Sequence, residues 1–186
     1  MPENAKLPQR RSVRLSEYDY AGAGAYFLTV VTDSRALLFG AVVDDEMRLN
    51  DLGRIVEDEW LRTAEVRQNV LLDSHVVMPN HFHGILILQD SGRDTVGATR
   101  RVARAPVSSG PQPGSIGAIM AQFKSLVAKR INAHRGSPGA VVWQRSFYEH
   151  IIRNETDLDE TRRYIAENPL KWALDAENPG ARVQVH

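Results

Sequence analysis

Two histidines, His81 and His83, stand one residue apart at the start of an apolar run in the stretch HVVMPNHFHGILIL. Side chains alternate between the two faces of a β-strand, so both imidazoles project to one side while Phe82 points to the other. Two imidazoles on one face can bind a single divalent ion. The commoner arrangement for such a pair is two neutral histidines that are satisfied by backbone partners.

A second candidate group lies further along the chain, where Tyr164 and Asn168 are four residues apart and therefore neighbours on one face of a helix. A steered phenol can attack phosphorus and form a covalent phosphotyrosine, and a bound metal ion would polarise that phosphate. The side-chain oxygen of Asn168 could serve as a third ligand. Tyrosine is also a common packing residue, and three others compete for the role: Tyr20, Tyr26 and Tyr148.

Hydrophobic periodicity predicts the elements that must position these side chains. Strands are expected at 25–33, 69–79, 81–88 and 141–153, with short edge strands around a turn at Asp44 and Asp45. Helices are expected at 51–67, 115–134 and 156–168, with the following caps: Asn50 or Asp51, Ser115, and Thr156. This order favours an α+β fold in which helices pack on a largely antiparallel sheet.

The composition fits one globular domain, with 42% hydrophobic and 25% charged residues in a chain of 186. The start of the chain lacks the apolar core of a signal peptide and no run is long enough for a membrane span, so we expect a cytoplasmic protein. Cysteine is absent, which excludes a disulfide framework and a thiolate metal site. Any metal must be bound through nitrogen and oxygen.

Basic residues concentrate between Arg93 and Arg135, where eight Lys or Arg face the single acidic residue Asp94. Such a segment could follow a phosphate backbone, although a solvated loop is the simpler interpretation. We divide the chain into a flexible basic N-terminus (1–17), a domain (18–175) with a flexible insertion (90–114), and a C-terminal tail (176–186).

Several stretches in this order resemble the single-tyrosine HUH transposases, in which two histidines flank a hydrophobic residue. They are MPNHFHGILIL and VWQRSFYEHIIRNETDLDETRRYIAENPLKW, preceded by YDYAGAGAYFLTVVTDSRALLFG and LNDLGRIVEDEWL. The resemblance is greatest to the REP-associated tyrosine transposases and covers about residues 18–172. It implies a ferredoxin-like sandwich with the histidines on the central sheet and the catalytic tyrosine on a C-terminal helix.

Carried over by position, the resemblance implies that His81, His83 and Asn168 bind Mg²⁺ or Mn²⁺ and that Tyr164 is the nucleophile. The implied activity is cleavage and rejoining of single-stranded DNA near REP-like hairpins through a 5′-phosphotyrosine, by a monomer or homodimer, with no nucleotide cofactor and no membrane partner. Candidate phosphate contacts are Lys124, Lys129, Arg130, Arg145 and Arg153, for which a solvated surface is the alternative.

Two other functions fit the same residues. The chain could bind hairpin DNA as a regulator that has lost cleavage. It could also be a metallo-hydrolase that uses the His pair and water, in which case Asp73 or His75 is the nearest candidate for a further ligand.

Overall fold

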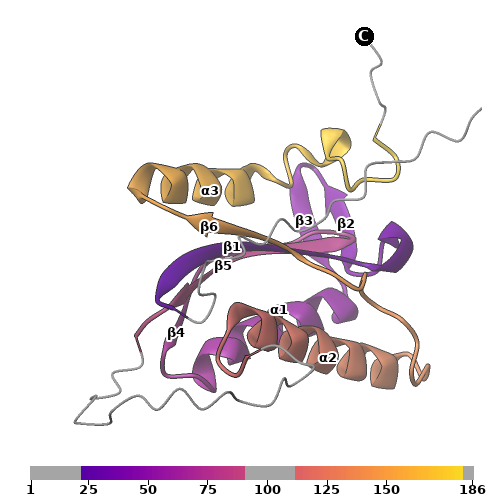
Figure 1. Cartoon of the computed structure of the whole chain (residues 1–186). Coiled ribbons are helices and arrows are strands. Elements are labelled where there is room, and N and C mark those ends of the chain that lie inside the picture. The colour runs from indigo at the N-terminus through magenta and orange to yellow at the C-terminus, as the bar shows by residue number, and fades with distance from the viewer. Residues whose placement is uncertain (1–21, 91–111, 182–186) are drawn as a thin grey trace, which may run out of the picture.

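The computed structural model describes residues 22–90 and 112–181, and its centre is one antiparallel sheet (Figure 1). The strand order is β4-β5-β1-β6. Helix α1 connects β1 to β4, and helix α2 connects β5 to β6, which is the βαββαβ arrangement of ferredoxin-like folds. The predicted α+β sandwich is therefore confirmed. The bounds are β1 Gly24–Val31, α1 Asp51–Glu65, β4 Val70–Val77, β5 His81–Leu88, α2 Ile116–His134 and β6 Tyr148–Ile152.

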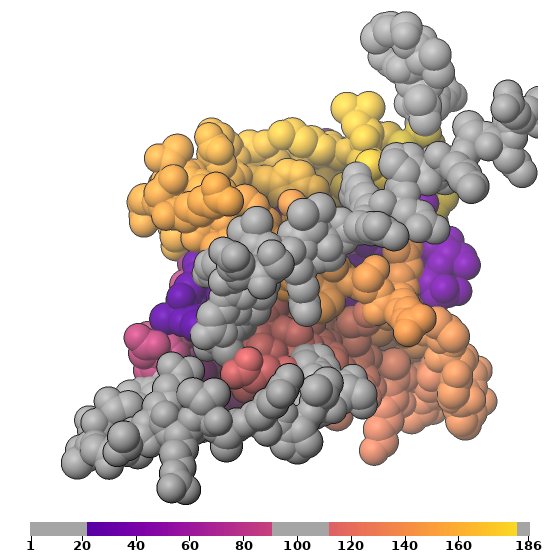
Figure 2. All heavy atoms as spheres, in the orientation of Figure 1, coloured from indigo at the N-terminus to yellow at the C-terminus, as the bar shows by residue number. Residues whose placement is uncertain are grey.

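The two faces of the sheet have different cover. Helices α1 and α2 pack on one face, and helix α3 (Glu155–Glu167) lies along the other, which gives three layers (Figure 1). In the space-filling view the orange and yellow atoms of the C-terminal part and the salmon atoms of α2 lie on opposite sides of the molecule (Figure 2). The larger core lies on the α1–α2 side and includes Trp60 and Phe82. A smaller cluster lies under α3 and consists of Phe27, Ile85, Ile152 and Ile165. Because β5 is covered on both faces, its sequence is apolar almost throughout.

The helix starts follow from side-chain caps. The Asn50 side chain accepts a hydrogen bond from the Gly53 amide at 2.9 Å, and that of Ser115 accepts one from the Ala118 amide at 3.3 Å, as predicted. The predicted cap of α3 at Thr156 is wrong, because Asn154 accepts from the Asp157 amide at 2.9 Å and the helix begins earlier.

The remaining elements are short. Strands β2 (Gly40–Val43) and β3 (Glu46–Leu49) form a separate hairpin around the predicted Asp44–Asp45 turn, and η1 (Asp33–Arg35) and η2 (Trp172–Leu174) are single 3-10 turns. The predicted strand at 141–153 is confirmed only over β6. Before β6 the segment forms only an isolated bridge between Trp143 and Thr32. The next three carbonyls, of residues 144, 145 and 146, accept hydrogen bonds from the Lys124 ammonium at 2.7, 3.0 and 3.2 Å.

Parts of the predicted domain organisation lie outside the described residues, namely the basic N-terminus (1–17), most of the insertion (90–114) and the end of the tail. Residues 176–181 are described, and in them Glu177 is buried. Among the described helices, none combines the length and apolar character that crossing a membrane requires.

Candidate functional site

His81 and His83 lie side by side on the face of β5 that α3 covers. Their ring centroids are 4.6 Å apart, and only 0% and 4% of the two residues is exposed. This end of β5 is enclosed, because Thr32 and Phe39 donate backbone hydrogen bonds to the carbonyls of Asn80 and Pro79 at 2.8 and 3.0 Å.

The tautomer of His81 is fixed by Asn80. The amide nitrogen of Asn80 donates to the backbone carbonyls of Arg35 (3.2 Å) and Glu177 (2.6 Å), so its Oδ1 must be the atom that faces His81. His81 Nδ1 lies 2.9 Å from this Oδ1 and therefore carries the proton. The opposite ring nitrogen, Nε2, is left with a lone pair and no hydrogen-bond partner among the described residues.

His83 is oriented from the neighbouring strand. Thr29 is its direct cross-strand partner on β1, and the Thr29 hydroxyl lies 2.8 Å from His83 Nδ1. The ring also stacks on Phe27, with centroids 5.2 Å apart. When Thr29 accepts the Nδ1 proton, Nε2 of His83 becomes available to a ligand.

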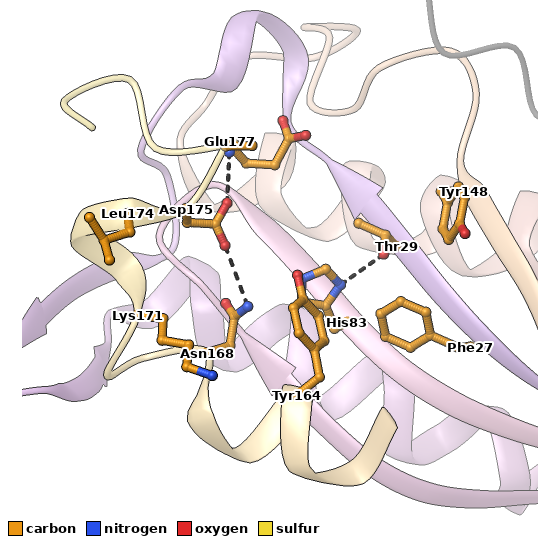
Figure 3. Close-up of a pocket in the computed structure, with 11 residues that line it drawn as sticks. Phe27, Thr29, His83, Tyr148, Tyr164, Asn168, Lys171, Leu174, Asp175 and Glu177 are labelled. Carbon is orange, nitrogen blue, oxygen red and sulfur yellow. Dashed lines mark hydrogen bonds between the residues drawn. The ribbon is translucent and has the colours of Figure 1, made fainter. Parts of the chain in front are cut away.

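Tyr164 reaches the histidines from α3. Its hydroxyl lies 3.4 Å from His83 Nε2, and its ring meets Phe27 edge-on at 5.8 Å (Figure 3). Tyr164 is 44% exposed and lines a cavity of about 760 Å³, together with His83, Asn168 and Asp175. His83 from β5 and Tyr164 and Asn168 from α3 and its end thus meet around one open cavity, while His81 lies beside His83 and outside its lining.

Asn168 caps the end of α3, as its place before Pro169 predicts. Its side chain is buried, and its Oδ1 has no hydrogen-bond partner in the described part of the chain. The Nδ2 atom contacts Asp175 Oδ2 at 3.4 Å, which directs the carbonyl oxygen away from that carboxylate. Asp175 Oδ2 in turn lies 4.0 Å from His81 Nε2.

Burial keeps both imidazoles neutral. It lowers the pKa of His81, against the opposing effect of the Asp175 and Glu177 carboxylates and the Asn168 side chain. Burial also lowers the pKa of His83 well below its ordinary value, and the neighbouring His81 adds to this shift. Neutral imidazoles are the form that binds metal ions.

The donor set fits a divalent cation. Two buried atoms, His81 Nε2 and Asn168 Oδ1, have no hydrogen-bond partner in the described residues. His81 Nε2 lies 4.0 Å from Asp175 Oδ2, and the His83 ring lies beside that of His81. No three His, Asp or Glu side chains within the described ranges are grouped tightly enough to bind an ion by themselves. A site built on the two histidines would therefore need a further donor, such as the amide oxygen of Asn168.

The residues proposed for a metallo-hydrolase do not join this group. Asp73 binds Arg162 of α3, with the closest oxygen and nitrogen 2.7 Å apart. His75 faces the opposite side of the sheet, where its ring lies 6.3 Å from that of Phe82 and its Nε2 lies 3.8 Å from Glu57. The placement of both side chains removes the support for that alternative.

The five predicted DNA contacts are not gathered at the cavity. Lys124 binds the carbonyls of residues 144–146, and Arg130 pairs with Glu59 and Asp58 at 2.8 and 3.2 Å. Both belong to α2, on the face of the sheet away from Tyr164 (Figure 1). The other three are exposed: Lys129, Arg145 and Arg153.

Sequence reasoning missed three residues that shape the site: Thr29, Asn80 and Asp175. Thr29 looks like any β-branched residue of a strand, and its contact depends on the β1–β5 register. Asn80 carried one signal, since it directly precedes His81. Asp175 carried none, because it follows a proline and a 3-10 turn that no periodicity predicts.

No family model matches the sequence. The chain is 37% identical over 174 residues to an uncharacterized protein of Haemophilus influenzae, covering 92% of this chain and 94% of that protein. A solved structure of a REP-associated tyrosine transposase bound to a REP hairpin is 22% identical, with a TM-score of 0.54 over 85% of this chain and 74% of the other. That likeness confirms the predicted fold. A Deinococcus radiodurans structure named as a transposase is more distant (18% identical, TM-score 0.41, 83% and 96% covered).

Proposed function

We propose that this chain, which belongs to the same family as the Haemophilus influenzae protein and has the fold of the REP-associated tyrosine transposase, cleaves and rejoins single-stranded DNA beside small hairpins. The observation that carries the proposal is the approach of the Tyr164 hydroxyl to His83 Nε2, at 3.4 Å, on the wall of an open cavity. The hairpin substrate is inferred from the DNA bound in the solved transposase structure.

In this reaction the Tyr164 oxygen attacks the scissile phosphorus and the bond from phosphorus to the 3′-oxygen breaks. The products are a 5′-phosphotyrosine and a free 3′-hydroxyl. The phenolic proton passes to water, which the half-exposed ring of Tyr164 allows, and the departing oxygen takes up a proton. One phosphate ester replaces another, so a second 3′-hydroxyl can reverse the step and join a new strand without ATP.

The residues proposed to hold Mg²⁺ or Mn²⁺ are His81, His83 and Asn168. Such an ion supplies positive charge beside the phosphate, where negative charge develops in the transition state. The chain itself contributes two neutral imidazoles, which Thr29 and Asn80 orient before any ion is bound. It also contributes the buried side-chain oxygen of Asn168.

DNA contact is proposed for the exposed cations Lys129, Arg145 and Arg153. A smaller contribution is proposed for Lys124 and Arg130, because each already has partners in the fold. Replacing an exposed contact should weaken binding of all sequences to a similar degree and lower its salt dependence.

The decisive experiment incubates the protein with a hairpin-bearing single strand and Mn²⁺ and separates covalent adducts on a denaturing gel. We expect Tyr164→Phe to abolish adducts while DNA binding, measured by fluorescence anisotropy, is retained. Tyr148→Phe is the matched control, because Tyr148 lines the same cavity with a similar exposure (48%) and should keep forming adducts.

The opposite pattern, with adducts lost in Tyr148→Phe and kept in Tyr164→Phe, would refute the assignment of the nucleophile. Binding by the wild-type chain without any nicking would identify it as the hairpin-DNA regulator instead.

A further inference from the structure

We propose that Asp175 is a fourth ligand of the cation site, supplying a carboxylate beside His81, His83 and Asn168. This inference rests on the metal-binding part of the proposed function. It concerns a residue that follows α3 and its proline, in the segment that closes one side of the cavity (Figure 3).

The carboxylate of Asp175 is held in a fixed direction. Its Oδ1 accepts a hydrogen bond from the Glu177 backbone amide at 2.7 Å, and the side chain is only 10% exposed. The other oxygen, Oδ2, has the long contact with Asn168 Nδ2 and faces the ring of His81. The Glu177 carbonyl accepts from Asn80, so the same short segment orients both Asp175 and, through Asn80, His81.

His81 Nε2 and Asp175 Oδ2 are both hydrogen-bond acceptors, and neither can supply a proton to the other. His81 Nε2 carries a lone pair because Asn80 fixes the proton on Nδ1, and Asp175 Oδ2 lies 4.0 Å from it. This distance is beyond hydrogen-bond reach, so a protonated imidazole does not explain the approach. Burying acceptors against one another is unfavourable unless a cation lies between them.

The spacing and chemistry suit a hard cation. An ion about 2.1 Å from each of two ligands can span about 4.2 Å, which accommodates the 4.0 Å between His81 Nε2 and Asp175 Oδ2. A set of two nitrogens and two oxygens, one of them charged, favours Mg²⁺ and Mn²⁺ more than two imidazoles alone would.

The test is the affinity of the full chain for Mn²⁺, measured without DNA from the loss of the free-ion signal in electron paramagnetic resonance. We expect Asp175→Asn to raise the Kd for Mn²⁺ by at least about 10-fold. Asp58→Asn is the matched control, because it removes the same charge from an exposed position on the other side of the sheet and should change the Kd less than about twofold.

An Asp175→Asn variant that binds Mn²⁺ as tightly as the wild type, while His81→Ala does not bind it, would overturn this proposal and leave the metal site intact. Absence of binding by the wild-type chain would overturn the metal site itself. If Asp175→Asn fails to fold, a crystal structure of the Mn²⁺-loaded wild type decides: metal density within about 2.5 Å of Oδ2 supports the proposal, and a longer separation overturns it.

Discussion

At the residue scale, the direction of each imidazole lone pair is set by a neutral polar neighbour on Nδ1. Thr29 performs this role for His83 across the β1–β5 ladder, and Asn80 performs it for His81 from the adjacent turn. Both neighbours fix which ring nitrogen carries the proton, and because they are uncharged they do not favour the protonated, charged form of the ring. The two imidazoles are therefore already oriented as the proposed metal site requires, which would reduce the reorganisation on binding an ion.

We expect Thr29→Val to weaken Mn²⁺ binding by about 10- to 100-fold, because valine preserves the shape but leaves the His83 Nδ1 proton without an acceptor. The free energy of unfolding should fall by about 1–3 kcal/mol for the same reason. Thr63→Val is the control, since the Thr63 hydroxyl donates to the Glu59 carbonyl within α1, remote from the cavity. Equal losses of Mn²⁺ affinity in both variants would contradict the role of Thr29.

At the element scale, the docking of α3 decides where Tyr164, the proposed nucleophile, lies. A β-bulge between Leu72 and His75 interrupts the β4–β5 ladder at Asp73, whose carboxylate binds Arg162 through two hydrogen bonds of 3.0 and 2.7 Å. Arg162 and Tyr164 belong to the same helix. Apart from this pair, α3 rests mainly on the small cluster around Phe27.

We expect Asp73→Asn to lower the melting temperature by a few degrees and to reduce adduct formation more than Mn²⁺ binding, because it loosens α3 and not β5. The hydrogen bond from Arg162 lowers the pKa of Asp73 from 3.8 to about 2. The stabilisation is therefore complete above about pH 4 and is lost as the pH falls towards 2. The difference in melting temperature between wild type and variant should shrink over that interval.

Glu155→Gln provides the comparison, because Glu155 also faces Arg162 but at 3.8 Å and with 80% exposure. If Glu155→Gln changes the melting temperature as much as Asp73→Asn does, the Asp73–Arg162 pair is no more important for the docking of α3 than an exposed ion pair.

Much of this architecture follows from local sequence pattern. Apolar spacing and the caps Asn50 and Ser115 predict α1 and α2, and β-branched runs predict β1, β4 and β5. The strand order could not be derived this way, since the pairing of Thr29 with His83 joins residues 54 apart. The motif resemblance instead implied the ferredoxin-like sandwich as a whole. The predicted cap of α3 was wrong because Asn154 and Thr156 are both acceptable N-cap residues, and the choice between them depends on tertiary packing.

At the scale of the whole molecule, the tyrosine and the histidines of one chain meet each other without a second copy. We expect a mixture of Tyr164→Phe and His81→Ala to form no covalent DNA adduct, because neither chain contains both halves of the site. Adducts would be followed on a denaturing gel, with each variant alone and the wild type beside the mixture. Recovery of adducts on mixing would instead show that the tyrosine helix is exchanged within a dimer.

The order of the strands in the sheet makes the two histidines less mobile than Tyr164. Thr29 and the two histidines lie on β1 and β5, the inner strands, which are paired on both sides. Tyr164 lies on α3, which packs on the smaller apolar cluster around Phe27. Amide hydrogens of the inner strands should exchange with solvent only when the whole sheet opens, and those of α3 when the helix undocks. In the proposed reaction the cleaved 5′ end is attached to α3, which can undock, whereas the ion is bound mainly by residues of the stable inner strand β5. The strength of helix docking would then set how long a DNA end remains poised for resealing.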